Sequence, residues 1–276
     1  MSNLLDITGL DVSFPSQVET ILAVREVSFT LKPSEVLGIV GESGAGKSTI
    51  GNAIINLLEP PGEITKGKIL FKGQNLRDLS DKEMRDIRGK KVGMIFQDPQ
   101  TSWNPLMTIG DQLIETINKS ANLYGRLAID KAIELLKSVG IDKPEVRLKS
   151  YPHQFSGGMR QRVVIALVLA GEPDLIIADE PTTALDVSIQ AQILDLIKKL
   201  CRERNLGVII ITHDIGVIAN IADRVSVMYN GSIVETGEVR QILTKPTHKY
   251  TRSLIAAVPR GNRKVERFKS IDYIEG

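Results

Sequence analysis

Residues 36–49 read VLGIVGESGAGKST, an apolar run followed directly by a glycine-rich loop. Within this stretch, residues 41–48 satisfy the phosphate-binding pattern G-x-x-x-x-G-K-[ST]. The apolar run 36–40 is typical of a buried central strand. A helix is expected from residue 47 to about residue 58, where the segment EPPG ends it. A strand, a glycine loop and a helix in this order predict an α/β fold with a nucleotide site.

Each part of the loop suits phosphate chemistry. Gly41, Gly44 and Gly46 let the backbone curl so that its N–H groups face the phosphates, and the helix N-terminus adds a favourable dipole. Lys47 is expected to reach the β- and γ-phosphates, and the Ser48 hydroxyl to coordinate Mg²⁺. The alternative is a glycine-rich turn without a ligand, but eight consecutive positions and both flanking elements fit the pattern. The expected ligands are ATP and Mg²⁺. The candidate nucleotide-binding residues of the loop are Gly41, Glu42, Ser43, Gly44, Ala45, Gly46, Lys47, Ser48 and Thr49.

A second apolar stretch, DLIIADE at 174–180, ends in two adjacent acids. Proteins of the α/β class place ligand chemistry at such strand ends. Asp179 is expected to hold Mg²⁺ indirectly, and Glu180 to orient and polarise an attacking water as the general base. Taken alone, an apolar strand followed by Asp-Glu is more often a strand with a solvated turn. The phosphate loop upstream is what favours the catalytic interpretation.

Residues 155–162 read FSGGMRQR. A helix is expected to begin at Ser156, Gly157 and Gly158. The Ser156 hydroxyl, the free N–H groups of the first turn and the positive end of the helix dipole can bind a γ-phosphate. Taken alone, the segment is equally compatible with an N-cap serine beside a flexible glycine pair. It resembles the signature sequence of the ABC transporter ATPase family, which other P-loop enzymes lack.

The resemblance implies roles for four further residues. Gln97, at the end of VGMIFQ, is similar to the loop glutamine that contacts Mg²⁺ or water and senses the transport subunit. Asp186 in TTALD resembles the acid that links two nucleotide sites across a dimer, and His213 resembles the switch histidine that contacts the γ-phosphate. Phe14 lies where the family usually has an aromatic that stacks on adenine, although a core phenylalanine is equally compatible. The metal contacts expected in this way are Ser48, Gln97 and Asp179.

Two stretches resemble one subgroup, the ATPases of dipeptide, oligopeptide and nickel importers. They are SWNPLMTIGDQL at 102–113 and PTHKYTRSLIAAVP at 246–259. The resemblance implies ATP hydrolysis that powers uptake of a peptide-like solute. It also implies two transmembrane permease subunits, a second nucleotide-binding domain in a homo-, hetero- or tandem dimer, and indirectly a solute-binding protein. Many members of the subgroup have a cysteine-rich tail that binds an iron–sulfur cluster. Here the sequence stops at YIEG without such cysteines, so no cluster is expected, and the chain is compatible with the first half of a tandem protein or a truncated form.

Hydrophobic periodicity gives the remaining elements. Alternating residues in 4–31 predict antiparallel strands. A strand pair is expected around 68–71 and 91–96, separated by a short exposed helix. Helical spacing between 97 and 154 predicts a small helical subdomain. From 156 onward, helices and strands alternate as in a parallel sheet.

The expected fold class is therefore α/β. It combines a P-loop NTPase core with a mainly parallel sheet, an N-terminal antiparallel β subdomain and an inserted helical subdomain at about 98–158. We expect a single nucleotide-binding domain over 1–276, with a family-specific C-terminal extension at about 240–276.

Composition excludes several classes of protein. The net charge of the 276 residues is only +2 and no basic stripe appears, so nucleic acid is not an expected partner. A single cysteine, Cys201, excludes an internal disulfide and suits a reducing compartment. No secretory signal and no run of roughly 20 apolar residues is present, so any membrane role is expected to come through docking on other subunits. The resemblance implies a peripheral protein on the cytoplasmic face of the inner membrane.

Two alternatives remain open at this point. A non-transport ABC protein, such as a DNA-repair or translation factor, would show a long coiled-coil insertion, a second domain or a basic face. A regulatory module that binds ATP without turnover would usually lack the catalytic acid or the switch histidine, and both Glu180 and His213 are present.

Overall fold

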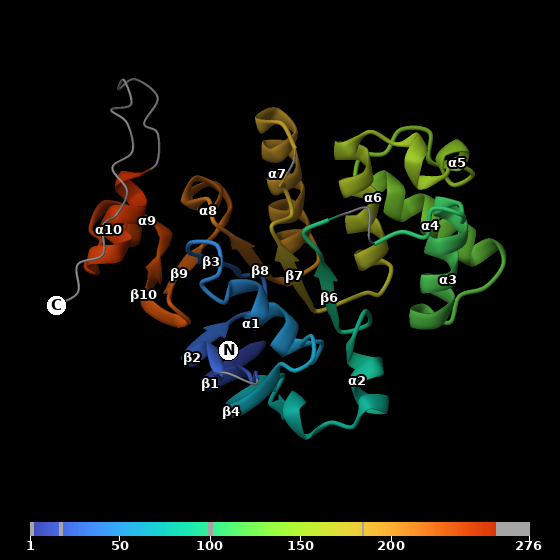
Figure 1. Ribbon diagram of the computed structural model, residues 1–276. Coiled ribbons are helices and arrows are strands. Elements are labelled where there is room, and N and C mark those ends of the chain that lie inside the picture. The colour runs from blue at the N-terminus through green and yellow to red at the C-terminus, as the bar shows by residue number, and fades with distance from the viewer. Residues whose placement is uncertain (1–2, 17–18, 99–101, 184, 258–276) are drawn as a thin grey trace.

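The computed structural model describes residues 3–16, 19–98, 102–183 and 185–257 (Figure 1). A four-stranded sheet has the order β2-β1-β4-β5, and a six-stranded sheet has the order β10-β9-β3-β8-β7-β6. The first sheet comprises β1 (Leu5–Phe14), β2 (Ile21–Leu31), β4 (Glu63–Phe71) and β5 (Gln74–Asn75). The second comprises β3 (Val36–Val40), β6 (Val92–Ile95), β7 (Leu175–Asp179), β8 (Gly207–Thr212), β9 (Arg224–Tyr229) and β10 (Ser232–Glu238). These two sheets and their helices confirm the α/β class.

Helices connect and cover the sheets. Those of the first half are α1 (Lys47–Ile54), the 3-10 turn η1 (Leu76–Asp78), α2 (Asp81–Ile87), α3 (Ile109–Ala121) and α4 (Arg126–Ser138). The others are α5 (Pro144–Arg147), η2 (Pro152–Gln154), α6 (Gly157–Leu169), α7 (Val187–Glu203), α8 (Ile215–Ile221), α9 (Val239–Thr244) and α10 (Lys249–Ala256). Among the described residues, no helix is both long and apolar enough to cross a membrane.

Strand β3 lies in the middle of the larger sheet, parallel to β8 on one side and β9 on the other. All five of its residues are buried, which confirms the prediction from the run VLGIV. Val36 and Val40 join one apolar core, while Leu37 and Ile39 join the other. The strand is apolar throughout because both faces of this sheet are covered.

Helix α1 packs between the two sheets, since it contacts β2 of the smaller sheet and β7 and β8 of the larger one. Ile50, Ala53 and Ile54 are its buried apolar residues. The loop that precedes α1 is therefore held by elements from both sheets.

Helices α3 to α6 gather at one side of the larger sheet (Figure 1). Thr108 caps α3 by accepting a hydrogen bond from the Asp111 N–H, and α3 packs against α4 and α6. Helices α3, α4 and α5 fall within the range 98–158 expected for a helical subdomain. The division of the chain into a core and a helical subdomain stays a prediction.

The expected strand pair at 68–71 and 91–96 is wrong. Strand β4 pairs with β1 and β5 in the antiparallel sheet, whereas β6 pairs in parallel with β7. The two strands are close in sequence but have different burial patterns. β4 is mostly exposed or half-buried, as suits an outer sheet, while three of the four residues of β6 are buried.

The helix expected to reach about residue 58 ends earlier, at Ile54. Asn56 has a φ of +51°, and the N–H of Leu57 donates to the carbonyl oxygen of Asn52 at 2.8 Å. Helices commonly end with a residue in the left-handed conformation and a hydrogen bond from the following N–H to a carbonyl oxygen of the last turn.

Three elements near the C-terminal end were not assigned from the sequence: β10, α9 and α10. Most of α9 and all of α10 fall in the expected extension at 240–276, of which residues 258–276 lie outside the described residues.

Candidate active site

The phosphate loop joins β3 to α1, as the sequence predicts. Gly46 has a φ of +94°, and a Cβ there would lie 2.2 Å from the carbonyl oxygen of Ala23 in β2. A Cβ at Gly41 would lie 2.2 Å from the carbonyl oxygen of Met228 in β9. Glycine at both ends of the loop therefore allows its backbone to lie directly against strands of both sheets.

Lys47 is the first residue of α1 and is only 5% exposed. Its Nζ donates to the carbonyl oxygen of Glu42 at 2.8 Å. Burial lowers the pKa of Lys47, although the nearby carboxylates of Glu180 and Asp179 act in the opposite direction. The side chain thus lies across its own loop, next to two acids.

The hydroxyl of Ser48 donates to Asp179 Oδ1 at 3.0 Å, so two of the three expected metal contacts are adjacent. Asp179 is 7% exposed, and burial raises its pKa. A hydroxyl beside a carboxylate is an all-oxygen donor set of the kind that Mg²⁺ prefers. No group of three or more His, Cys, Asp or Glu side chains within the described ranges could hold a metal by itself. The two residues therefore fit an ion that takes its other ligands from phosphates and water.

The carboxylate of Glu180 accepts three side-chain hydrogen bonds. His213 Nδ1 lies 2.9 Å from Oε1, while Thr183 Oγ1 and Gln97 Nε2 donate to Oε2 at 2.8 and 3.2 Å. Burial opposes ionisation of this carboxyl, but the hydrogen bonds from His213 and Thr183 outweigh it and lower the pKa of Glu180. The acid is thus held ionised and fixed in orientation.

Three of these residues follow the ends of neighbouring strands. Gln97, Glu180 and His213 come directly or almost directly after β6, β7 and β8, which are adjacent in the sheet. Because the carboxyl ends of parallel strands meet at one edge, residues far apart in sequence converge there. The structure therefore brings together the three candidate catalytic residues.

Two features of this cluster were not expected from the sequence. Thr183 was missed, although a hydroxyl three residues after an acid in a turn is a recognisable sign of a local hydrogen bond. Gln97 was expected to contact the metal, but its amide donates to Glu180. Among the described residues, no hydrogen bond joins Gln97 to Ser48 or Asp179.

No hydrogen bond among the described residues joins Ser156, Gly157 or Gly158 of the signature segment to this cluster. Ser156 is exposed and caps α6, accepting a hydrogen bond from the Met159 N–H at 3.4 Å. A Cβ at Gly158 would lie 2.5 Å from the side chain of Ile189 in α7, so glycine there permits close packing of α6 on α7. Within the part of the chain that the structure describes, no hydrogen bond joins Ser156, Gly157 or Gly158 to the phosphate loop.

Asp186 is exposed and is the N-cap of α7. Its Oδ1 accepts hydrogen bonds from the Ile189 N–H at 3.0 Å and the Ser188 hydroxyl at 2.9 Å. These bonds lower the pKa of Asp186. Within this chain the residue starts a helix, and it makes no hydrogen bond to the described residues of the phosphate loop.

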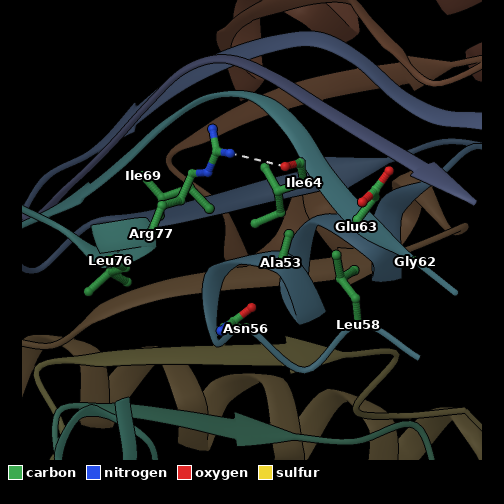
Figure 2. A pocket seen from close by; sticks show the side chains of 9 residues that line it. All are labelled: Ala53, Asn56, Leu58, Gly62, Glu63, Ile64, Ile69, Leu76 and Arg77. Atoms are coloured by element: carbon green, nitrogen blue, oxygen red, sulfur yellow. Dashed lines mark hydrogen bonds between the residues drawn. The ribbon is translucent and has the colours of Figure 1, made fainter. Parts of the chain in front are cut away.

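Phe14 is half-buried in the core around α1, where its ring faces Gly62. Gly62 lines a cavity of about 300 Å³ between the end of α1, β4 and η1 (Figure 2). In that cavity the Arg77 guanidinium donates to the carbonyl oxygen of Ile64. No residue of the phosphate loop lines it. The packing of Phe14 thus favours the core role left open by the sequence.

Residues 24–183 match the family described as ABC transporter. The chain is 53% identical over 260 residues to the oligopeptide transport ATP-binding protein OppD of Bacillus subtilis (strain 168), which covers 94% of this chain and 73% of OppD. It is 52% identical over 261 residues to the dipeptide transport ATP-binding protein DppD of the same organism, covering 94% of this chain and 78% of DppD. Among solved structures it is similar to a dimeric, post-hydrolysis state of the ATP-binding cassette MJ0796 bound to ADP and Pi. That match has a TM-score of 0.75 and 32% identity, and it covers 86% of this chain and 99% of the other.

Proposed function

This chain belongs to the ABC transporter family, and we propose that it powers the import of peptide-like solutes by hydrolysing ATP. It is an ABC ATPase, and its relatives are ATP-binding transport proteins. Their printed names, oligopeptide and dipeptide transport, support the solute class. They also oppose the two alternatives, a DNA-repair or translation factor and a regulatory module without turnover.

The observation that carries the proposal is the Glu180 carboxylate, held by three donors close to the buried Lys47. A general base must be ionised to accept a proton, and the lowered pKa of Glu180 keeps it so at neutral pH. In the proposed reaction, Glu180 orients the attacking water and takes its proton. His213 orients Glu180 and is available to the γ-phosphate.

Lys47, the backbone of residues 41–49 and the α1 N-terminus would hold the phosphates of ATP. Ser48 and Asp179 would hold Mg²⁺, which neutralises charge on the β- and γ-phosphates when bound. Gln97 would join that ion only after its amide leaves Glu180. Phe14 as an adenine contact has less support, because its ring faces Gly62.

Ser156, Gly157, Gly158 and Asp186 are proposed to act in a dimer. They make no hydrogen bond to the described residues of their own phosphate loop, and Ser156 and Asp186 are exposed. The dimeric state of MJ0796 supports a second nucleotide-binding domain as partner. In this arrangement the signature segment of one domain completes the ATP site of the other.

The proposed membrane partners are two transmembrane permease subunits, with a solute-binding protein acting through them on the far side. This places the chain at the cytoplasmic face of the inner membrane. A groove of about 490 Å³ between α3, α4 and α5 supports docking of a permease. Ile114, Ile129 and Ile133 give it an apolar lining, and Arg126 and Asp130 are among its polar residues.

The test is reconstitution in proteoliposomes with two permease subunits and a peptide-binding protein. Labelled oligopeptide should enter only when ATP is supplied on the side that holds this chain. Glu180→Gln should keep ATP binding but slow hydrolysis by about 10²–10⁴-fold, because the amide keeps the shape but is not a base. Hydrolysis at the wild-type rate in this variant would contradict the assignment of the base, and hydrolysis without peptide uptake would contradict the solute class.

A further inference from the structure

Helix α10 supplies a hydrogen bond to the phosphate loop, although the two are far apart in sequence. The backbone N–H of Glu42 donates to the hydroxyl of Tyr250 at 3.1 Å. The carbonyl oxygen of the same residue accepts the hydrogen bond from Lys47 Nζ. Both backbone groups of Glu42 are therefore engaged, the N–H by α10 and the carbonyl oxygen by Lys47 and by the Ala45 N–H, which donates to it at 3.2 Å.

The hydroxyl of Tyr250 is held in place by its surroundings. Its ring packs on the ring of Tyr229, with centroids 4.4 Å apart and an interplanar angle of 35°. Tyr229 is the last residue of β9, the strand paired with β3, from which the phosphate loop emerges. Burial raises the pKa of Tyr250, so the hydroxyl stays neutral at physiological pH.

The start of α10 is fixed by Glu235 of β10. This carboxylate accepts hydrogen bonds from the Thr247 N–H at 2.7 Å, the Thr247 hydroxyl at 2.8 Å and the His248 N–H at 3.0 Å. His248 in turn caps α10, because its Nδ1 accepts from the Tyr250 N–H at 3.2 Å. A continuous set of hydrogen bonds thus leads from β10 through α10 to the phosphate loop.

We propose that Tyr250 is a positioning residue that fixes the first turn of the phosphate loop for nucleotide binding. This inference rests on the proposed function, in which Lys47 binds the phosphates and must leave the Glu42 carbonyl oxygen. The hydrogen bond from Glu42 N–H to Tyr250 is independent of that exchange. It holds the first turn of the phosphate loop in place while Lys47 moves, so that the other backbone N–H groups of the loop keep their spacing.

Tyr250→Phe tests this, because it removes the hydroxyl and keeps the ring on Tyr229. Two quantities are measured on the whole chain: amide hydrogen exchange at Glu42 without nucleotide, and ADP affinity by calorimetry. Exchange at Glu42 should become faster. ADP should bind about threefold to tenfold more weakly, as expected for loss of one neutral hydrogen bond. ATP turnover should show a higher KM and an unchanged kcat.

Tyr229→Phe is the matched control. It removes a hydroxyl with no hydrogen bond among the described residues and leaves the ring pair intact, so both measurements should stay at wild-type values. Glu235→Gln is a second variant, which should speed exchange at Glu42 less than Tyr250→Phe does, since it loosens only the start of α10.

Wild-type exchange at Glu42 or wild-type ADP affinity in Tyr250→Phe would overturn the proposal. A loss of ADP affinity in Tyr229→Phe equal to that in Tyr250→Phe would also overturn it, because Tyr229→Phe leaves the hydrogen bond between Glu42 and Tyr250 in place. Failure of the wild-type chain to bind ADP would instead contradict the proposed function, while the exchange measurement would still test the contact.

Discussion

At the scale of single residues, the state of Glu180 decides what the site can do. An acid with fewer donors would be protonated more readily, and an unheld carboxylate would not keep one orientation toward a water molecule. Hydrogen bonds from His213 and Thr183 lower the pKa of Glu180, and the amide of Gln97 adds a third donor that helps to fix the orientation of the carboxylate.

Thr183→Ala should raise the pKa of Glu180, because it removes a hydrogen bond to the ionised form. The acid limb of the pH profile of kcat/KM should therefore move to higher pH. We expect hydrolysis at neutral pH to fall by roughly fivefold, the value of about one hydrogen bond. Thr183→Ser keeps the hydroxyl and should keep the wild-type profile. If the pH profiles of Thr183→Ala and the wild type were superimposable, Thr183 would not act on Glu180.

Sequence reasoning predicted most of this site at the residue scale and missed parts that depend on the fold. Local sequence patterns next to strand ends include Lys47, Ser48, Asp179, Glu180 and His213. Because the ends of parallel strands meet at one edge of the sheet, these residues are expected to converge there. Tyr250 could not be found in this way, because its contact with Glu42 depends on how α10 packs.

At the scale of elements, the groove between α3, α4 and α5 allows the proposed coupling to transport to be tested separately from basal hydrolysis. Ile129 is 38% exposed and lines the groove, far in sequence from every proposed catalytic residue. Ile129→Asp should leave ATP hydrolysis by the isolated chain unchanged. In proteoliposomes it should abolish most of the stimulation by substrate-loaded binding protein, because a buried charge without a partner opposes docking.

Leu127→Asp provides the control for that experiment. Leu127 is on the same helix and is 64% exposed, but it does not line the groove. It should keep most of the stimulation. Equal stimulation in the Ile129 variant and the wild type would exclude this groove as the permease contact.

The docking of α10 should depend on pH through Glu235. Burial opposes ionisation of this carboxyl, but the hydrogen bonds from the N–H and hydroxyl of Thr247 and from the N–H of His248 outweigh it and lower its pKa to about 2. A folded-state pKa below the unfolded value means that the stabilisation is complete above about pH 4.5 and is lost as the pH falls toward about 2. Since Glu235 is partly exposed, we expect about 1 kcal/mol or less.

The measurement is the free energy of urea unfolding of the wild type and Glu235→Gln between pH 7 and pH 2.5. The difference between the two should be constant near neutral pH and should shrink below about pH 4.5. A difference that does not change with pH would show that the ionised carboxylate is not what holds α10.

One error of sequence analysis at the element scale arose because chain neighbours need not be sheet neighbours. β4 and β6 are separated mainly by η1 and α2, yet they lie in different sheets. The end of α1 was placed too late because Asn56, rather than a glycine, adopts the left-handed conformation there. The central strands were predicted well, because burial on both faces leaves a continuous apolar run.

At the scale of the whole molecule, the proposed dimer would make the active site a property of two domains, because the exposed Ser156 of one would complete the site of the other. Ser156→Arg should block closure of the dimer while leaving ADP binding by the monomer intact, since a bulky cation would fill the proposed phosphate niche. Hydrolysis per wild-type molecule should rise with protein concentration. Size-exclusion chromatography with light scattering measures formation of the dimer, and an ATPase dilution series measures hydrolysis per molecule. Constant specific activity at concentrations where only monomer exists would rule out a shared site.

The position of β3 between β8 and β9 also determines when the phosphate loop can form during synthesis. β1, β2 and β4 are complete once residue 71 has been made, so the small sheet can assemble early. β3, by contrast, waits for both of its neighbours, the later of which ends at Tyr229, roughly 190 residues after Val40. At about 5–20 residues per second, the ribosome leaves this apolar strand without partners for about 10–40 s. Chains stalled before residue 207 should therefore be cut by protease within 36–49 and should fail to retain ADP, whereas chains released after Tyr229 should resist cleavage there. For that interval the strand that leads into the phosphate loop is unpaired, and a chaperone that covers apolar segments would bind it directly beside the future nucleotide site.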